Sequence, residues 1–192
     1  MPGPPAERRA GEGTREAAQR VATDLFIRQG YDATSLREIA GALGIKKASL
    51  YYHFESKEAI VESVLAARLR ELDDLTAWAS RQPAGPDRID ATVLRWIGDG
   101  SADKVRGVRF VNANPALMGR MEGSSSFPTR FGALVRVLVG DDAGVWRRQL
   151  VSMALLSINA AVMADPGGLR TDDEILAAAR GMAEALLARL RQ

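Results

Sequence analysis

The sequence predicts an all-α fold, with a small three-helix unit at the N-terminus and a larger helical region after it. Apolar residues recur at steps of three and four along most of the chain, and strand-like alternation is nearly absent. No Pro occurs between Ala6 and Gln82, so none interrupts the first helices. Two capping boxes, at Ser35 and Thr171, mark helix starts. We expect three parts: a disordered tail over 1–13, the three-helix unit over 14–56 and the helical region over 57–192.

Composition limits the class of protein. Hydrophobic residues make up 46% and charged residues 26% of the chain, as in ordinary globular proteins. No apolar segment is long enough to span a bilayer and the N-terminus lacks an apolar leader, so we expect a cytoplasmic protein with no membrane partner. The chain has no Cys, and His53 is its one His. We therefore expect neither a metal site nor a cofactor.

Local signals define the first two helices. An apolar stripe over 17–26 ends at Gly30, a residue type common at helix C-termini. Ser35 and Glu38 form the capping box of a second, shorter helix, since each side chain can satisfy a free backbone N–H of the first turn.

Gly44 supplies the turn to a third helix over about 46–53. Ser56 then caps a long helix over about 57–80. The second and third helices share one small apolar core, which consists of Leu36, Ile39, Ala40, Leu43, Ile45, Leu50 and Phe54.

The remainder of the chain is also predicted to be helical, divided by Pro residues. The Gly/Ser run at 123–126 is expected to be its least structured interior segment. Thr171 and Glu174 form the capping box of the last helix. The expected helices lie over 87–98, 101–112, 115–122, 128–139, 142–164 and 172–190.

The block from Thr34 to Lys57 resembles the N-terminal signature of TetR-family transcriptional regulators. The run of aromatic residues followed by Ser-Lys-Glu is its most specific part. The resemblance implies a helix-turn-helix DNA-binding domain followed by a helical domain for effector binding and dimerisation. The matching residues are Ser35-Leu36, Ile39-Ala40, Gly44-Ile45, Leu50-Tyr51-Tyr52-His53-Phe54 and Lys57.

The side chains of the third helix fit DNA recognition. A recognition helix presents its N-terminal residues to base edges in the major groove. Lys47 can donate to guanine and Ala48 can contact a thymine methyl group, while Ser35 and Arg37 are placed for phosphates. The resemblance also implies a phosphate contact for Lys57. The predicted DNA-binding residues are Ser35, Arg37, Lys46, Lys47, Ala48, Ser49, Tyr51, His53 and Lys57.

Lys46 departs from the family pattern, which has Ser or Thr at this position as a helix cap. A Lys side chain cannot accept the N-terminal hydrogen bonds and its charge opposes the helix dipole, at a cost of roughly 1 kcal/mol. We therefore expect Lys46 to contact DNA. Tyr52 and Phe54 are expected to be structural.

Two apolar stripes near the C-terminus predict a homodimer. A monomer can bury one stripe per helix, so two stripes suggest that these helices are shared between subunits. Small residues on the last helix would also allow another helix to approach closely. An intrachain helical hairpin is the alternative, while the resemblance implies a four-helix dimer bundle. The predicted interface residues are Val151, Leu155, Ile158, Val162, Ile175, Leu176, Ala179, Met182, Ala183, Leu186 and Leu190.

Bulky apolar residues between the motif and these stripes predict a ligand cavity, although plain core packing would also explain them. Few charges interrupt the apolar faces, which favours an uncharged, largely apolar effector. The candidate lining residues are Trp78, Trp96, Phe110, Asn114, Met118, Met121, Phe127, Phe131, Met153 and Asn159.

These observations predict a one-component transcriptional repressor that binds a near-palindromic DNA operator as a dimer and is released by a small-molecule effector. A ligand-independent or activating DNA-binding protein is the alternative. A helical enzyme with an incidental motif is disfavoured, because the chain has no Gly-rich phosphate loop and no recognisable nucleophile–base spacing.

Overall fold

The computed structural model describes residues 5–98 and 101–192, apart from the side chains of 5–12, 101 and 122–125. All regular secondary structure over these residues is α-helical, which confirms the predicted fold class. The helices are α1 (Pro5–Gln29), α2 (Leu36–Ala42), α3 (Lys47–His53), α4 (Lys57–Ser80), α5 (Pro86–Gly98), α6 (Ser101–Ala113), α7 (Pro115–Met118), α8 (Glu122–Val139), α9 (Val145–Leu155), α10 (Ser157–Met163) and α11 (Asp172–Leu190).

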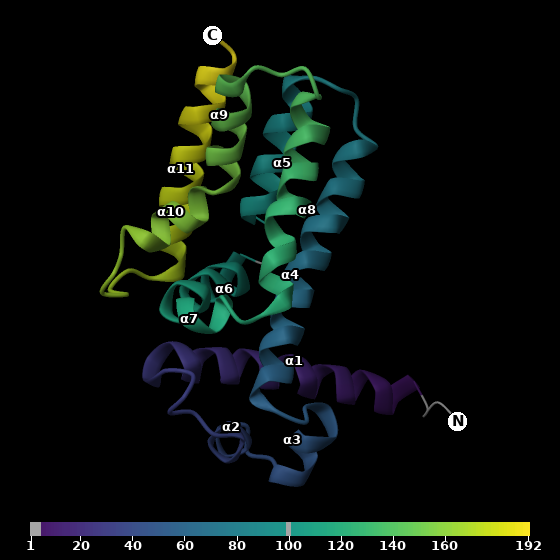
Figure 1. The fold of residues 1–192 in the computed structure, drawn as a ribbon, viewed down its shortest axis with the longest axis vertical. Coiled ribbons are helices and arrows are strands. Elements are labelled where there is room, and N and C mark those ends of the chain that lie inside the picture. The colour runs from purple at the N-terminus through teal and green to yellow at the C-terminus, as the bar shows by residue number, and fades with distance from the viewer. Residues whose placement is uncertain (1–4, 99–100) are drawn as a thin grey trace.

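The helices form a small lower part and a larger upper part (Figure 1). In that view α1 lies across the molecule with α2 and α3 beneath it, and α4 rises from this lower part into the upper one. There α4 packs along α8, while α9, α10 and α11 form one edge of the molecule. The α6–α7 segment lies between the two parts and packs on α1.

Both predicted capping boxes are present. The Ser35 hydroxyl accepts the Glu38 N–H at 3.2 Å, and the Glu38 carboxylate accepts the Ser35 N–H at 2.7 Å. Thr171 and Glu174 form the same pair of bonds at the start of α11. The predicted starts of these two helices are therefore confirmed.

The start of the first helix differs from the prediction. Helix α1 begins at Pro5, so residues 5–13, which we expected in a disordered tail, are helical. Ala, Glu and Arg residues in this stretch favour helix, and they extend the helix that packs on the core further along. Residues 1–4 of the expected tail lie outside the described part of the chain.

Three boundaries in the second half also differ. Helix α7 ends at Met118, and α8 extends from Glu122 through the Gly/Ser run that we expected to be the least structured. The single helix expected over 142–164 is divided at Leu156 into α9 and α10. At this break the Trp96 indole N–H donates to the carbonyl oxygen of Leu155 at 3.1 Å. A bond from another helix thus takes up a carbonyl that a continuous helix would use internally.

Two clusters of buried residues make up the core. The lower cluster joins α1, α2 and α3 to the first turns of α4, through Ile60, Val61 and Leu65. The upper cluster includes Leu72 and Leu75, further along the same helix. Helix α4 is therefore part of both cores. It begins at Lys57, where the sequence predicted the start of the long helix. None of the helices over the described residues combines the length and the apolar character that crossing a membrane requires.

Candidate functional site

The third helix is fixed to the lower core by one face. Leu50 is 0% exposed and Phe54 2% exposed, as the sequence predicted. Gly44, with a φ of +68°, allows the tight turn that brings α3 onto α2. The opposite face is exposed to solvent and consists of Lys46, Lys47, Ala48 and Ser49. The helix thus presents a short, basic and hydrogen-bonding surface on a rigid support.

Lys46 is the N-cap residue of α3, and it has extended backbone angles of φ −68° and ψ 144°. Its side chain makes no capping hydrogen bond. A cationic side chain therefore occupies the position where a hydroxyl or carboxylate would stabilise the helix.

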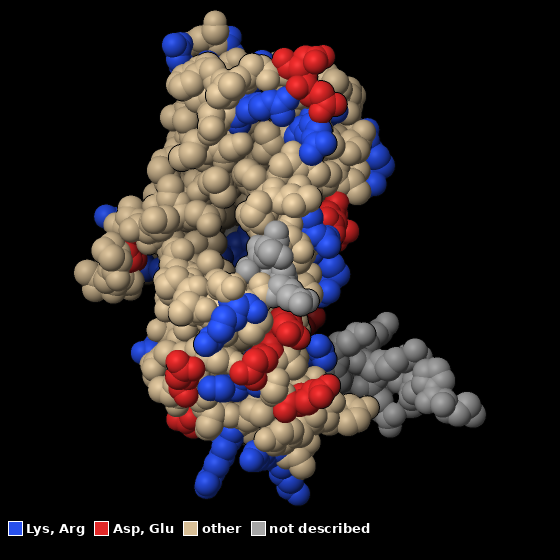
Figure 2. Space-filling view, viewed as in Figure 1, with Lys and Arg blue, Asp and Glu red and all other residues tan. Residues whose placement is uncertain are grey.

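Other basic residues lie close to this surface. Ser35 and Arg37 on α2 are exposed, and Figure 2 shows Lys and Arg side chains projecting from the end of the molecule formed by α2 and α3. The Lys47 ammonium lies 5.3 Å from the centre of the Tyr51 ring, which is 45% exposed. The end of the molecule formed by α2 and α3 therefore suits a polyanion.

Tyr52 corrects one expectation. We expected a structural role, but its side chain is 87% exposed and meets the half-buried His53 edge to face, with ring centroids 5.3 Å apart. A ring this exposed contributes little to packing in the isolated chain, and it lies beside the other exposed residues of α3. Helical spacing alone could not identify it, because Tyr51 and Tyr52 are adjacent and both aromatic.

Arg15 holds the C-terminal end of α3 in place, and sequence reasoning missed it. Its guanidinium donates to the carbonyl oxygen of His53 at 3.0 Å and lies 4.4 Å from the centre of the Phe54 ring. A cation at a helix C-terminus is electrostatically favourable. No local signal pointed to this contact, because Arg15 and His53 are 38 positions apart.

Lys57 lies apart from the exposed group. Its ammonium donates to the carbonyl oxygen of Tyr31 at 2.7 Å and lies 4.3 Å from the centre of the Tyr31 ring. The Tyr31 hydroxyl in turn donates to Glu58 at 2.5 Å. Burial and this bond raise the pKa of Tyr31, and the same bond lowers the pKa of Glu58. In this structure Lys57 fixes the α1–α2 connection, so the expected phosphate contact would require it to share its ammonium with that carbonyl.

The upper part contains a cavity of about 240 Å³ lined by residues of α4, α5, α6, α7, α8 and α10. Four of the predicted lining residues line it: Trp96, Met118, Phe127 and Asn159. The other lining residues are Leu65, Arg68, Leu69, Lys104, Gly107, Val108, Val111 and Ile158.

The remaining six candidates do not line this cavity. Phe110 and Met121 belong to the lower core, where the Phe110 ring centre lies 5.8 Å from that of Phe26. The Asn114 amide donates to the Phe110 carbonyl oxygen at 2.9 Å. Met153 is 47% exposed on α9. Trp78 and Phe131 pack against the upper core. Bulk and apolar character identified buried positions, but they could not distinguish a cavity wall from a filled core.

The cavity wall also contains charge, although the sequence favoured an uncharged, largely apolar effector. Arg68 and Lys104 are both in its wall, and Lys104 is only 5% exposed. The Lys104 ammonium donates to the Trp96 carbonyl oxygen at 2.6 Å and lies 4.4 Å from the centre of the Trp96 ring. Both cations lie among other charged residues in the sequence, and 36 positions separate them, so their common wall appears only after folding.

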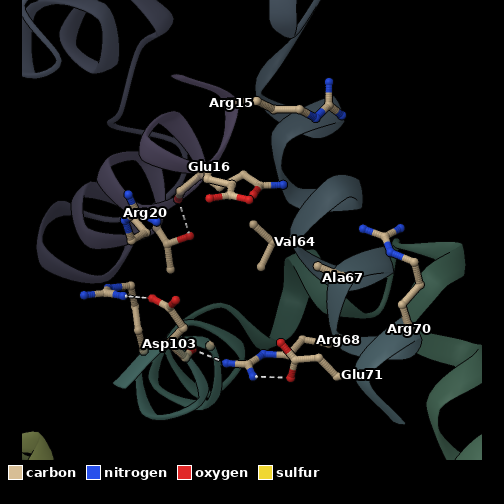
Figure 3. Close-up of a pocket in the computed structure, with 13 residues that line it drawn as sticks. Arg15, Glu16, Arg20, Val64, Ala67, Arg68, Arg70, Glu71 and Asp103 are labelled. Atoms are coloured by element: carbon tan, nitrogen blue, oxygen red, sulfur yellow. Dashed lines mark hydrogen bonds and ion pairs between the residues drawn. The ribbon is translucent and has the colours of Figure 1, made fainter. Parts of the chain in front are cut away.

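A second, polar groove of about 430 Å³ lies where α1, α4 and α6 meet (Figure 3). Arg68 borders both the groove and the cavity. Its guanidinium bonds the carboxylate of Glu71 at 3.0 Å and also the carbonyl oxygen of Asp103 on α6. It lies so close to Gly107 that a Cβ added there would be 2.7 Å from Arg68 Nη2. Arg68 therefore joins α4 to α6 beside the lower part of the molecule.

Most residues of the predicted dimer stripe are covered within the single chain. These residues pack in the core of their own chain, with exposures of 6% or less: Val151, Leu155, Ile158, Val162, Ile175, Ala179 and Ala183. Leu176, Leu186 and Leu190 are partly buried against the same core. Met182 is the one predicted residue that is exposed, at 37%. The intrachain packing of α9, α10 and α11 explains the two stripes.

A different apolar face is left exposed on the same helices. Trp146 is 66% exposed and Met153, one heptad further along α9, is 47% exposed. Met163 at the end of α10 is 69% exposed. On α11, Met182 lies beside the small exposed residues Gly181 and Ala185. The three helices that carry these residues lie together at one edge of the molecule (Figure 1), and their exposed apolar residues are here called the α9–α11 face.

The fold and the α3 surface together define a helix-turn-helix protein with a larger helical domain. Residues 20–64 match the family model described as bacterial regulatory proteins, tetR family. The HTH-type transcriptional repressor KstR2 of Rhodococcus jostii (strain RHA1) is 42% identical over 73 residues, which are 38% of this chain and 36% of KstR2. The negative transcriptional regulator IcaR of the biofilm operon icaADBC, from Staphylococcus aureus (strain Newman), is 58% identical over 41 residues, which are 21% of this chain and 22% of IcaR.

The likeness to solved structures extends over nearly the whole chain. The ketosteroid transcriptional regulator KstR2 of Mycobacterium tuberculosis has the same fold, with a TM-score of 0.65 and 20% identity over 92% of each chain. AmtR of Mycobacterium smegmatis gives a TM-score of 0.58 at 20% identity, over 92% of this chain and 94% of AmtR. The tetR family match thus covers the helix-turn-helix region, this chain spans well under half the length of the curated relatives it matches, and the chain as a whole shares the fold of the solved regulators.

Proposed function

We propose that the protein is a ligand-responsive transcriptional repressor that binds a near-palindromic operator as a homodimer. The observation that supports this most directly is the exposed surface of α3. Lys46, Lys47, Ala48 and Ser49 are all exposed, while Leu50 between them and the helix end is fully buried. A helix held in this way can enter the major groove without first reorganising.

The exposed residues divide by the kind of DNA contact that they can make. Lys47, Ala48 and Ser49 at the start of α3 would meet base edges. Ser35 and Arg37 on α2 would meet phosphates, which set the register. The residues that border this surface would contact the sugar–phosphate backbone. They are Lys46 at the N-cap and the side chains of Tyr51, Tyr52 and His53.

The α9–α11 face is our candidate for the dimer interface, in place of the buried stripe. Trp146 and Met153 provide large apolar anchors of the kind that dominate protein interfaces. Gly181 and Ala185 allow a second helix to approach closely. A twofold axis through this face would place two α3 helices on one duplex, roughly 34 Å or a multiple of it apart.

The cavity beside α4 is the proposed effector site. Helix α4 lines the cavity with Leu65, Arg68 and Leu69, and the same helix packs in the lower core through Ile60 and Val61. A ligand that prefers one position of α4 would therefore change the placement of α3. Equal affinity for both positions would leave the equilibrium unchanged.

The names of two relatives support repression, since KstR2 is called a repressor and IcaR a negative regulator. The test is a fluorescence-anisotropy titration of the full chain against duplexes from its own upstream region, with scrambled duplexes as controls. We expect specific binding at least about 10³-fold tighter than nonspecific binding. Equal binding to all duplexes by a folded, helical protein would contradict the proposal. Transcription from the bound promoter then separates repression from activation.

A further inference from the structure

We infer that the effector is a small apolar molecule with an anionic head group, of the carboxylate class, and that Arg68 and Lys104 bind this head group. The inference rests on the proposed role of the cavity as the effector site. It goes further by naming the charge and size of the ligand.

The buried position of Lys104 is the first argument. Lys is rarely 95% buried in proteins unless its ammonium has polar or charged partners, because the ammonium loses its hydration there. Lys104 has this degree of burial in the wall of an otherwise largely apolar cavity. Its contact with the Trp96 carbonyl and ring fixes the ammonium at the cavity wall. A fixed cation at an apolar site attracts an anion far more strongly than a cation in water does.

Arg68 supplies a second cation and the geometry that suits a carboxylate. Its planar guanidinium can bond two oxygens side by side. Its present carboxylate partner, Glu71, has a side chain that is 43% exposed, and such surface pairs contribute little stability. A ligand carboxylate can therefore replace Glu71 at low cost. No Asp or Glu is among the described residues that line the cavity, so none of these would repel the anion.

The rest of the wall defines the ligand's body. Trp96, Val108, Val111 and Phe127 are apolar, and Asn159 adds one amide to the wall. An engineered cavity of about 150 Å³ holds benzene. A cavity of about 240 Å³ therefore has room for one ring and a short chain. Figure 2 shows the molecule hollowed at this level, with Lys or Arg atoms at the floor of the hollow.

The test compares two probes with the same skeleton and different charge, 4-phenylbutyrate and the neutral 4-phenylbutyramide. Both are titrated into the full-length protein by isothermal titration calorimetry. We expect the carboxylate to bind at least tenfold more tightly than the amide. Lys104→Met and Arg68→Gln should each remove most of this preference and leave amide binding within about twofold. Arg70→Gln is the matched control, because Arg70 lies on the same helix but borders only the polar groove.

Equal affinities of the wild-type protein for the two probes would overturn the inference, and so would failure of both to bind at millimolar concentration. A preference that survives both substitutions would also overturn it. Circular dichroism checks that the variants fold. If either variant does not fold, the comparison of probes on the wild-type protein still decides.

A separate measurement distinguishes this inference from the proposed function. The anisotropy assay measures whether the carboxylate and the amide each release the operator duplex from the protein. Release by the amide at the same concentration as the carboxylate would preserve effector control and overturn the anionic class. Tight, charge-dependent binding without release would support the anionic site and contradict effector control by this class of molecule.

Discussion

Lys46→Ser is expected to stabilise the protein while weakening its binding to DNA. Lys46 is the N-cap of α3 and makes no side-chain capping bond. A Ser hydroxyl at this position can accept the backbone N–H of Ala48 or Ser49, which contributes about 1 kcal/mol. Removing a cation from the helix N-terminus adds roughly 0.3–1 kcal/mol. For a chain of this size, a gain of about 1 kcal/mol raises Tm by about 2–4 °C.

The effect on DNA binding has the opposite sign. If Lys46 neutralises one phosphate, its loss reduces the slope of log K against log salt by about 0.9 per subunit, or about 1.8 per dimer. Extrapolated from about 1 M salt, this change in slope corresponds to roughly 30-fold weaker binding at about 0.15 M salt. Anisotropy titrations of an operator duplex from about 50 to 300 mM salt measure the slope, and thermal unfolding measures the stability.

Lys47→Ser is the control, because it removes a neighbouring charge without adding a cap. It should weaken DNA binding but leave Tm nearly unchanged. Two results would refute the reasoning about Lys46: a salt slope that equals that of the wild-type protein, or a Tm that falls.

Three further predictions concern the interface, a close contact and a titrating pair. Trp146→Glu should convert the dimer to a monomer in sedimentation velocity with unchanged helicity; a retained dimer would exclude this face. Gly132→Ala, with nothing within 4 Å of the added Cβ, should stabilise the protein by about 0.5–1 kcal/mol in urea unfolding, whereas Gly107→Ala should gain less, because its methyl group must displace the end of the flexible Arg68 side chain, 2.7 Å away. The Glu58 pKa is lowered in the fold by the Tyr31 hydroxyl, so this stabilisation is complete above the usual Glu pKa of about 4.3 and is lost as the pH falls below it. Tyr31→Phe should reduce that pH dependence in urea unfolding, and an unchanged pH profile would contradict it.

Signals that depend on nearby residues predicted the structure well. Each capping box needs a hydroxyl and a carboxylate three positions apart, and both formed as expected at Ser35 and Thr171. The small core around Leu50 and Phe54 also follows from short-range spacing. Together these placed the exposed surface of α3 correctly from the sequence.

Signals that depend on a distant partner were less informative. Helical periodicity shows that a helix has an apolar face but does not show which neighbour covers it. The stripe through Val151 and Ile158 is therefore covered within the chain rather than by a second copy. For the same reason, the division of α9 from α10 was not predictable, because it coincides with a bond from Trp96, 59 positions away. Lys104 was an ordinary charged residue in the sequence until the fold placed it beside that indole.

The membership of α4 in both cores has a consequence for how the protein can be divided. A fragment that ends at residue 56 would lack Ile60, Val61 and Leu65, which are at most 8% exposed in the intact lower core. It would expose their apolar partners and lose a large share of its stability. The helix-turn-helix unit is thus not an independent folding module, and its melting is coupled to that of the larger helical part through a shared helix. Substitutions around the cavity can therefore alter the thermal stability of the DNA-binding end without touching it.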